Sequence, residues 1–168
     1  ARTLLEQSGH TVIGQSTAGA DGLIAADFAQ PRAADALWAA ALAQAGGRID
    51  VLVNNAGVFE AAPIDDADGF AATWARSHAI NLQSAADLCR HAVLHFQENG
   101  GGRIINVASR AGHRGDSPQH WHYAAAKGGS GIVGLTSGRT TINASGNFLH
   151  SPYYSAALDP SSGPGVGS

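Results

Sequence analysis

Short apolar runs alternate with longer segments of helical periodicity along most of this chain. This alternation constrains the fold most, because strands that are apolar throughout need helices on both faces of their sheet. We predict strands at residues 10–15, 22–26, 49–53 and 103–108. We predict helices at residues 2–8, 31–45, 68–98 (as one helix or two) and 119–136. The order of elements therefore predicts an α/β fold with a parallel sheet between two layers of helices.

The composition narrows the class of protein. A formal net charge of -3 provides no basic footprint for nucleic acid. Cys89 is the only cysteine, which excludes an internal disulfide and favours a reducing compartment. No apolar run is long enough to cross a bilayer, and the first residues lack the cationic and apolar regions of a secretion signal. We therefore expect a cytoplasmic protein with neither nucleic acid nor membrane as a partner.

The sequence WHYAAAKGG at residues 121–129 places a tyrosine and a lysine four residues apart. Lys127 is the only lysine, whereas the other nine basic residues are arginine. Within the predicted helix, Tyr123 and Lys127 project from one face. A free tyrosine is a weak acid-base catalyst at neutral pH, but a nearby ammonium favours the phenolate form. The pair therefore suits proton transfer at a substrate oxygen, although the same spacing also occurs in plain surface contacts.

Polar residues also follow two of the predicted strands. The sequence NNAG, Asn54–Gly57, follows the strand at 49–53, and Ser109 follows the strand at 103–108. Ligands of parallel sheets bind beyond the carboxyl ends of the strands, so we expect both segments to line one site. A hydroxyl such as that of Ser109 can hold a substrate oxygen beside a phenol.

The sequence NNAG, Asn81 in the long helix, Ser109 after an apolar strand and YxxxK at Tyr123–Lys127 occur in one order and at compatible spacings. In these features the chain resembles the classical short-chain dehydrogenase/reductases (SDRs) over residues 1–136. The resemblance implies a Rossmann-like doubly wound sheet in three layers, α/β/α. It also implies an oxidoreductase that transfers hydride reversibly between NAD or NADP and a small alcohol or carbonyl substrate, and a homo-oligomeric full-length parent. NNAG favours this branch over the extended sugar epimerases and dehydratases.

Carried over residue by residue, the resemblance implies roles for four side chains. Tyr123 would be the acid-base catalyst, and Lys127 would favour its phenolate form and bind the nicotinamide ribose. Ser109 would orient and polarise the substrate oxygen. Asn81 would support a water that relays protons to Lys127. On this interpretation the nicotinamide does the hydride chemistry, and the protein supplies position and electrostatics.

The resemblance also implies a cofactor site at the strand ends. Asn54, Ala56 and Gly57 would line the adenosine side of the cofactor and brace the sheet, while Asp27 would bond the adenine amine. An acidic residue at the end of the family's second strand favours NAD, and a basic one favours NADP. Residues 14–17, GQST, contain neither, so the choice between NAD and NADP stays open.

Structural roles compete with three of these assignments. Ser109 also suits a turn cap, and Asn81 also suits an ordinary helix position. Asp27 also suits a turn, or an N-cap ahead of Pro31. A second hypothesis for the whole chain is a catalytically inactive fragment or pseudoenzyme that acts, if at all, by subunit association through its two long helices.

Eight histidines raise the question of a metal site. His91 and His95 are four residues apart on the long helix, which suits two ligands of one ion. There is no HExxH sequence and no acidic third ligand at a suitable spacing, so we predict no metal and expect packed or solvated histidines. His120 and His122 are candidates for substrate contact only because they lie close to Tyr123 in the sequence.

The chain departs from the family pattern at both ends. A first strand and the glycine-rich TGxxxGxG phosphate loop are absent before the helix at 2–8. Because that strand would be central in the sheet, we expect unpaired strand edges and exposed apolar faces. Residues 1–137 are thus predicted to form a partial NAD(P)-binding domain, truncated at both ends and lacking the first and the C-terminal strands. Residues 138–168 are predicted to be an irregular or disordered tail foreign to the family.

Overall fold

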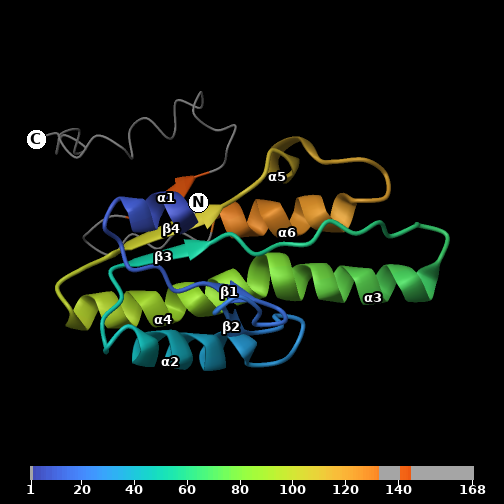
Figure 1. Cartoon of the computed structure of the whole chain (residues 1–168). Helices are drawn as coiled ribbons and strands as arrows, with labels where there is room; N and C mark the ends of the chain where they lie inside the picture. Colours follow the sequence, from blue (N-terminus) through green and yellow to red (C-terminus); the bar gives the residue numbers. More distant parts are fainter. Residues whose placement is uncertain (1, 133–140, 145–168) are drawn as a thin grey trace, which may run out of the picture.

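The computed structural model describes residues 2–132 and 141–144 (Figure 1). Within them, helices and strands alternate much as the sequence predicts. The helices are α1 (Arg2–Gln7), α2 (Ala33–Gln44), α3 (Ala67–His78), the π-helix η1 (Ala79–Gln83), α4 (Ser84–Glu98), α5 (Ala111–Arg114) and α6 (Trp121–Ile132). The strands are β1 (Gln15–Ser16), β2 (Ile24–Ala25), β3 (Val51–Asn54), β4 (Arg103–Val107) and β5 (Thr141–Ala144).

The described strands pair in parallel. β4 lies between β3 and β5, while β1 pairs with β2 in a separate two-stranded sheet. The register aligns Asn54 of β3 with Asn106 of β4, so the segments that follow these strands leave from the same sheet edge. Parallel strands connected through helices are the Rossmann-like arrangement that the sequence predicts, divided here between two sheets.

β1 and β3 each have one edge without a neighbouring strand among the described residues. Val51 and Val53 of β3 are 48% and 50% exposed, which matches the expected exposure of apolar side chains at such an edge. β1 and β2 are only two residues long, shorter than the apolar runs that predicted them. The reason is that an apolar run forms a ladder only where a neighbouring strand supplies donors and acceptors. Here the pairing begins with the Ile24 N–H, which donates to the Gly14 carbonyl at 2.9 Å.

The hydrophobic core lies where α2 packs on α4 and α4 packs on the β3–β4 sheet (Figure 1). Trp38 of α2 stacks on His91 with 6.0 Å between ring centroids and meets His95 edge-on at 5.8 Å. Burial of apolar surface supplies most of the driving force that holds these layers together. The buried members of the core are Ala26, Phe28, Ala34, Leu37, Trp38, Ile80, Leu88, Cys89, Ala92, Phe96 and Ile104.

The segment predicted as one long helix or two folds as α3, η1 and α4, with helical backbone at the junctions. Asp66 caps α3 by accepting the Gly69 N–H at 3.0 Å. After α4, Gly101 adopts φ 115° and donates to the Phe96 carbonyl at 2.7 Å, which ends the helix. The π-helix widens one turn between these ends and holds Asn81 in the interior.

The loop predicted after Ser109 contains a short helix, α5. The Ser109 Oγ accepts the Ala111 N–H at 3.2 Å, which starts this turn. α5 packs directly on α6 because Gly112 faces Gly128, and a Cβ on Gly112 would lie 2.7 Å from the Gly128 nitrogen. The small residues of α6 therefore allow another backbone to approach closely.

The C-terminal part differs from the prediction in two places. α6 begins at Trp121 because residues 117–120 close a turn of their own, and residues 133–136 of the predicted helix lie outside the described residues. Residues 141–144 of the tail form β5 beside β4, where the sequence predicted irregular structure. Pairing with the backbone of β4 creates this strand, and side-chain periodicity does not indicate it. The rest of the tail lies outside the described residues.

Candidate functional site

Asn54 ends β3 at the carboxyl edge of the sheet. Its Nδ2 donates to Asn106 Oδ1 of β4 at 2.8 Å and to Cys89 Sγ of α4 at 3.4 Å. Asn54 is buried, and its Oδ1 has no hydrogen-bond partner among the described residues. The amide thus ties two strands and a helix together and leaves one buried acceptor at the strand end.

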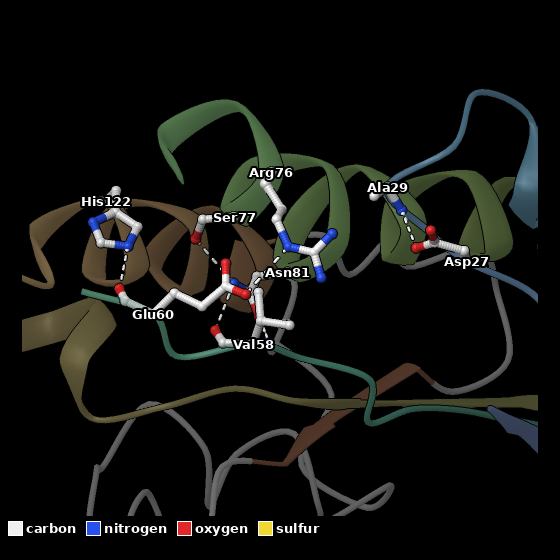
Figure 2. Close-up of polar contacts among 8 residues, drawn as sticks. All are labelled: Asp27, Ala29, Val58, Glu60, Arg76, Ser77, Asn81 and His122. Carbon is white, nitrogen blue, oxygen red and sulfur yellow. Dashed lines mark hydrogen bonds and ion pairs between the residues drawn. The ribbon is translucent and has the colours of Figure 1, made fainter. Parts of the chain in front are cut away.

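Asn81 fixes the chain that leaves β3 (Figure 2). Its Oδ1 accepts the Val58 N–H at 2.9 Å, and its Nδ2 donates to the Val58 carbonyl at 3.0 Å. The same Nδ2 donates to Ser77 Oγ, one helical turn earlier, at 3.0 Å. Asn81 is 2% exposed. Its amide therefore acts towards Val58 as a neighbouring strand would, and holds the loop on the π-helix.

Gly57 brings this loop against two of the predicted site residues. A Cβ at this position would lie 2.9 Å from Asn81 Oδ1 and 3.4 Å from Lys127 Nζ. Glycine leaves the backbone this close to both groups without displacing either. The loop after β3, the π-helix and α6 therefore meet at one point.

Lys127 lies at that point, on the same face of α6 as Tyr123. Its Nζ is 5.9 Å from the centroid of the Tyr123 ring and donates to the Val107 carbonyl at 3.2 Å. Lys127 is 6% exposed, and burial lowers the pKa of its ammonium. An ammonium has three donors, and the described bond to Val107 uses one of them. The site is therefore centred on the buried Lys127 ammonium, whose remaining N–H donors are available to a ligand.

The described hydrogen bonds of Ser109 and Asp27 do not involve this cation. The Ser109 Oγ accepts the Ala111 N–H, which is the turn contact, and Ser109 is connected to α6 through the packing of α5. Ala56 is exposed in the loop after β3. Asp27 follows β2 of the separate sheet, where its Oδ1 accepts the Ala29 N–H at 3.0 Å (Figure 2). The structure thus groups Gly57, Asn81, Tyr123 and Lys127, and leaves Asp27 apart.

His122 is fully buried next to this group. Its Nε2–H donates to the Glu60 carbonyl at 2.9 Å, since a carbonyl can only accept (Figure 2). Nδ1 then carries the lone pair and has no hydrogen-bond partner among the described residues. Burial lowers the pKa of the His122 imidazole, and the bond to the Glu60 backbone opposes this in part. His122 therefore holds the loop as a neutral donor.

Further contacts hold the same loop between α3 and α6. The Glu60 carboxylate pairs with Arg76 of α3 at 3.2 Å (Figure 2). The Ala62 N–H donates to the Gln119 carbonyl, just before α6, at 2.8 Å, and Ala62 is fully buried. Residues 55–66 are therefore fixed against both helices, although they contain no regular structure.

Phe59, which was not predicted from the sequence, is presented by this loop beside the site. Its ring stacks on His120 with 3.9 Å between centroids and 7° between planes. The same ring meets that of Tyr123 edge-on, at 4.9 Å and 83°. Phe59 is nevertheless 55% exposed. The available signal was a large apolar residue two positions after NNAG, in a loop that follows a strand end.

The histidines of the long helix serve separate contacts. His91 Nε2 pairs with Asp35 Oδ1 at 2.7 Å, whereas His95 Nε2 accepts the Ile49 N–H at 3.1 Å. Across residues 2–132 and 141–144, no three His, Cys, Asp or Glu side chains form a group that could hold a metal ion. In the same part of the chain, no helix has both the length and the apolar character of a membrane span.

Comparison with known protein sequences gives consistent matches. The family profile described as short chain dehydrogenase matches residues 6–140. The chain is 35% identical over 161 residues to cis-4-hydroxycyclohexanecarboxylate dehydrogenase of Sinomonas cyclohexanicum, and the match covers 87% of this chain and 62% of that relative. It is 43% identical over 90 residues to D-beta-hydroxybutyrate dehydrogenase of Rhizobium meliloti, covering 54% of this chain and 33% of that relative.

Solved structures agree with the sequence matches. A short chain dehydrogenase from Mycobacterium smegmatis superimposes with a TM-score of 0.56 and 37% identity, over 64% of this chain and 43% of that one. Acetoin dehydrogenase from Salmonella typhimurium superimposes with a TM-score of 0.56 and 34% identity, over 68% of this chain and 46% of that one. The chain spans 33% to 62% of the length of the two sequence relatives described above.

Proposed function

This chain belongs to the short chain dehydrogenase family, and from that membership we propose that it is an NAD(P)-dependent oxidoreductase acting on a small alcohol or carbonyl substrate. The observation that carries the proposal is the meeting of Gly57, Asn81 and Lys127 beside Tyr123. These residues come from a loop, a π-helix and an α-helix. Their convergence fixes one buried ammonium beside the Tyr123 ring, and this pair suits proton transfer by the phenol.

Tyr123 is the proposed acid-base catalyst. Its hydroxyl gives a proton to the carbonyl oxygen during reduction, and its phenolate form takes one from the alcohol during oxidation. Lys127 supports this role because its Nζ lies 5.9 Å from the Tyr123 ring centroid, where a positive charge favours the phenolate form. Burial strengthens the interaction, since charges act over a lower effective dielectric away from water.

A nicotinamide cofactor, when bound, supplies or accepts the hydride. The residues present suit such a group, because Lys127 has donors beyond the one used by the backbone and Asn54 has a buried acceptor without a partner among the described residues. Lys127 would hold a ribose hydroxyl. Asn54, Ala56 and Gly57 would line the adenosine side, and Asp27 would bond the adenine amine with the carboxylate oxygen that Ala29 does not use.

Ser109 and Asn81 have supporting roles in this proposal. The Ser109 Oγ accepts the Ala111 N–H, which leaves the hydroxyl proton to orient and polarise the substrate oxygen. The Asn81 amide is committed to Val58 and Ser77, so Asn81 acts by holding the loop against Lys127. The described bonds leave the second lone pair of Asn81 Oδ1 for a proton-relaying water beside Lys127.

The variant Tyr123→Phe tests the catalytic role. We expect it to lose turnover by about 100-fold or more, because general acid-base catalysis contributes at least that much. Its Kd for NADH or NADPH, measured by fluorescence titration, should stay at the wild-type value. Wild-type turnover by Tyr123→Phe would refute the assignment.

An inactive member of the family that acts through subunit association is the second candidate. The exposed Val51 and Val53 favour it, because the described residues place no strand beside one edge of β3 and such edges attract partners. Titration of the folded chain with NAD(H) and NADP(H) separates the candidates. Saturable binding favours the oxidoreductase, whereas no binding of either cofactor favours the inactive member.

A further inference from the structure

Phe59 has a large apolar side chain that is exposed to solvent beside Tyr123. It is 55% exposed, yet the chain on both sides of it is fixed. Val58 forms two hydrogen bonds with the Asn81 amide, and the Glu60 carbonyl accepts one from His122. A surface phenylalanine without a function does not need fixed backbone on both sides. The exposed ring of Phe59 also lacks the hydrophobic stabilisation that burial would give it.

The ring of Phe59 has one covered face and one open face. His120 covers one face in a parallel stack at 3.9 Å, and the His120 Nδ1 is in turn hydrogen-bonded to Ser117 Oγ at 2.6 Å. Tyr123 meets the ring almost perpendicularly, at 83°, and Phe59 stays 55% exposed with both neighbours in place. The opposite face accounts for the exposure of Phe59 and is a flat apolar surface next to the Tyr123 ring.

The charged groups near Phe59 interact with other residues. The Glu60 carboxylate pairs with Arg76 on α3 (Figure 2). Burial disfavours the charged form of His122. The Lys127 ammonium is buried and donates to the backbone of β4. A group that packs on Phe59 therefore meets a flat surface next to a carboxylate, that of Glu60, which is already paired, and this suits a planar and uncharged partner.

We infer that the open face of Phe59 forms a subsite for a planar uncharged substituent, such as an aryl ring, carried on the reacting carbon of the substrate. This inference rests on the proposed function for the position of the substrate oxygen at Tyr123, and adds the substrate class: aryl alcohols and aryl ketones. Aromatic rings gain from offset stacking beyond the area that they bury. The gain corresponds to a preference of up to about tenfold over an aliphatic ring of similar size.

A matched pair of probes tests the inference: 1-phenylethanol and 1-cyclohexylethanol share one carbon skeleton and differ in having a flat or a puckered ring. We would measure the Kd of each for the full chain by NMR titration, so the readout does not require turnover. We expect 1-phenylethanol to bind about five- to tenfold more tightly. Phe59→Leu should bring the two Kd values together, whereas Phe59→Trp should keep the preference. Leu94→Ala, at an exposed apolar position on α4, is the control and should change neither Kd.

The outcomes separate this inference from the proposed function. Equal Kd values for the two probes, no binding of either, or a preference that survives Phe59→Leu would each overturn the subsite, even if the chain oxidises other alcohols. A phenyl preference that Phe59→Leu abolishes would support the subsite, even if neither NAD nor NADP gives turnover. Tyr123→Phe should keep the phenyl preference in Kd, because stacking on Phe59 does not need the hydroxyl. A circular dichroism melt of each variant confirms that it is folded.

Discussion

Replacing Asn81 by leucine should destabilise the fold more than any surface change on the same helix. The two side chains are similar in size, so the main loss is the three hydrogen bonds to Val58 and Ser77. Each such bond contributes about 0.5–1.5 kcal/mol net, which together gives about 2–4 kcal/mol. Ser77 is 1% exposed and would keep a buried hydroxyl without its partner, which favours the upper half of that range.

Urea unfolding measures this loss. For a domain of this size an m-value of about 2 kcal/mol/M converts 2–4 kcal/mol into a midpoint about 1–2 M lower, with the m-value unchanged. Gln83→Leu is the matched control, because Gln83 is an exposed member of the same π-helix that bonds Asp87 at 2.8 Å. The control should stay within about 0.5 kcal/mol of wild type.

A double-mutant cycle checks the origin of the effect. Combining Asn81→Ala with Ser77→Ala should give a coupling of about 1 kcal/mol, since both single changes remove the same bond. Asn81→Asp should keep the bond from the Val58 N–H but lose both donated ones. A loss below about 1 kcal/mol in Asn81→Leu would contradict the view that this amide fastens the loop.

Three further outcomes follow from buried groups near the site. Burial lowers the pKa of Lys127, so the unfolded chain holds that proton more tightly, and stability should rise as pH increases from the folded pKa towards about 10. Thermal melts at neutral and alkaline pH should show this rise, and its persistence in Lys127→Met would contradict the assignment. Burial also lowers the pKa of His122, so stability should fall as pH drops through and below about 6.5. His122→Gln keeps a neutral donor and should show a smaller fall in urea titrations between about pH 7 and 5, and an equal fall would exclude His122 as the cause. Gly112→Ala places a Cβ 2.7 Å from the Gly128 nitrogen and should cost about 1–3 kcal/mol in the same assay, whereas an unchanged midpoint would mean that α5 can move away from α6.

Local patterns were enough to predict the elements that frame the site. The apolar runs that became β3 and β4 and the helical periodicity of α2 and α4 follow from nearest neighbours along the chain. The four-residue spacing of Tyr123 and Lys127 likewise predicts the common helix face on which both side chains lie. Predictions of this kind succeed because helix and strand geometry repeat over a few residues.

Contacts between residues distant in the sequence decided the features that local patterns did not predict. The bond from Asn81 to Val58 spans 23 residues and that from His122 to Glu60 spans 62, so no local pattern could pair them. The π-helix, the division into two sheets and β5 beside β4 also depend on which backbones meet in space. Phe59 shows the same limit, since its sequence position indicates a loop and only its ring contacts with His120 and Tyr123 place it beside α6. The sequence by itself determined the α/β order and the helix face shared by Tyr123 and Lys127, because both depend on short-range geometry. Tertiary structure decided how the loop after β3 packs against α6, because that packing depends on hydrogen bonds and ring contacts between residues distant in the sequence.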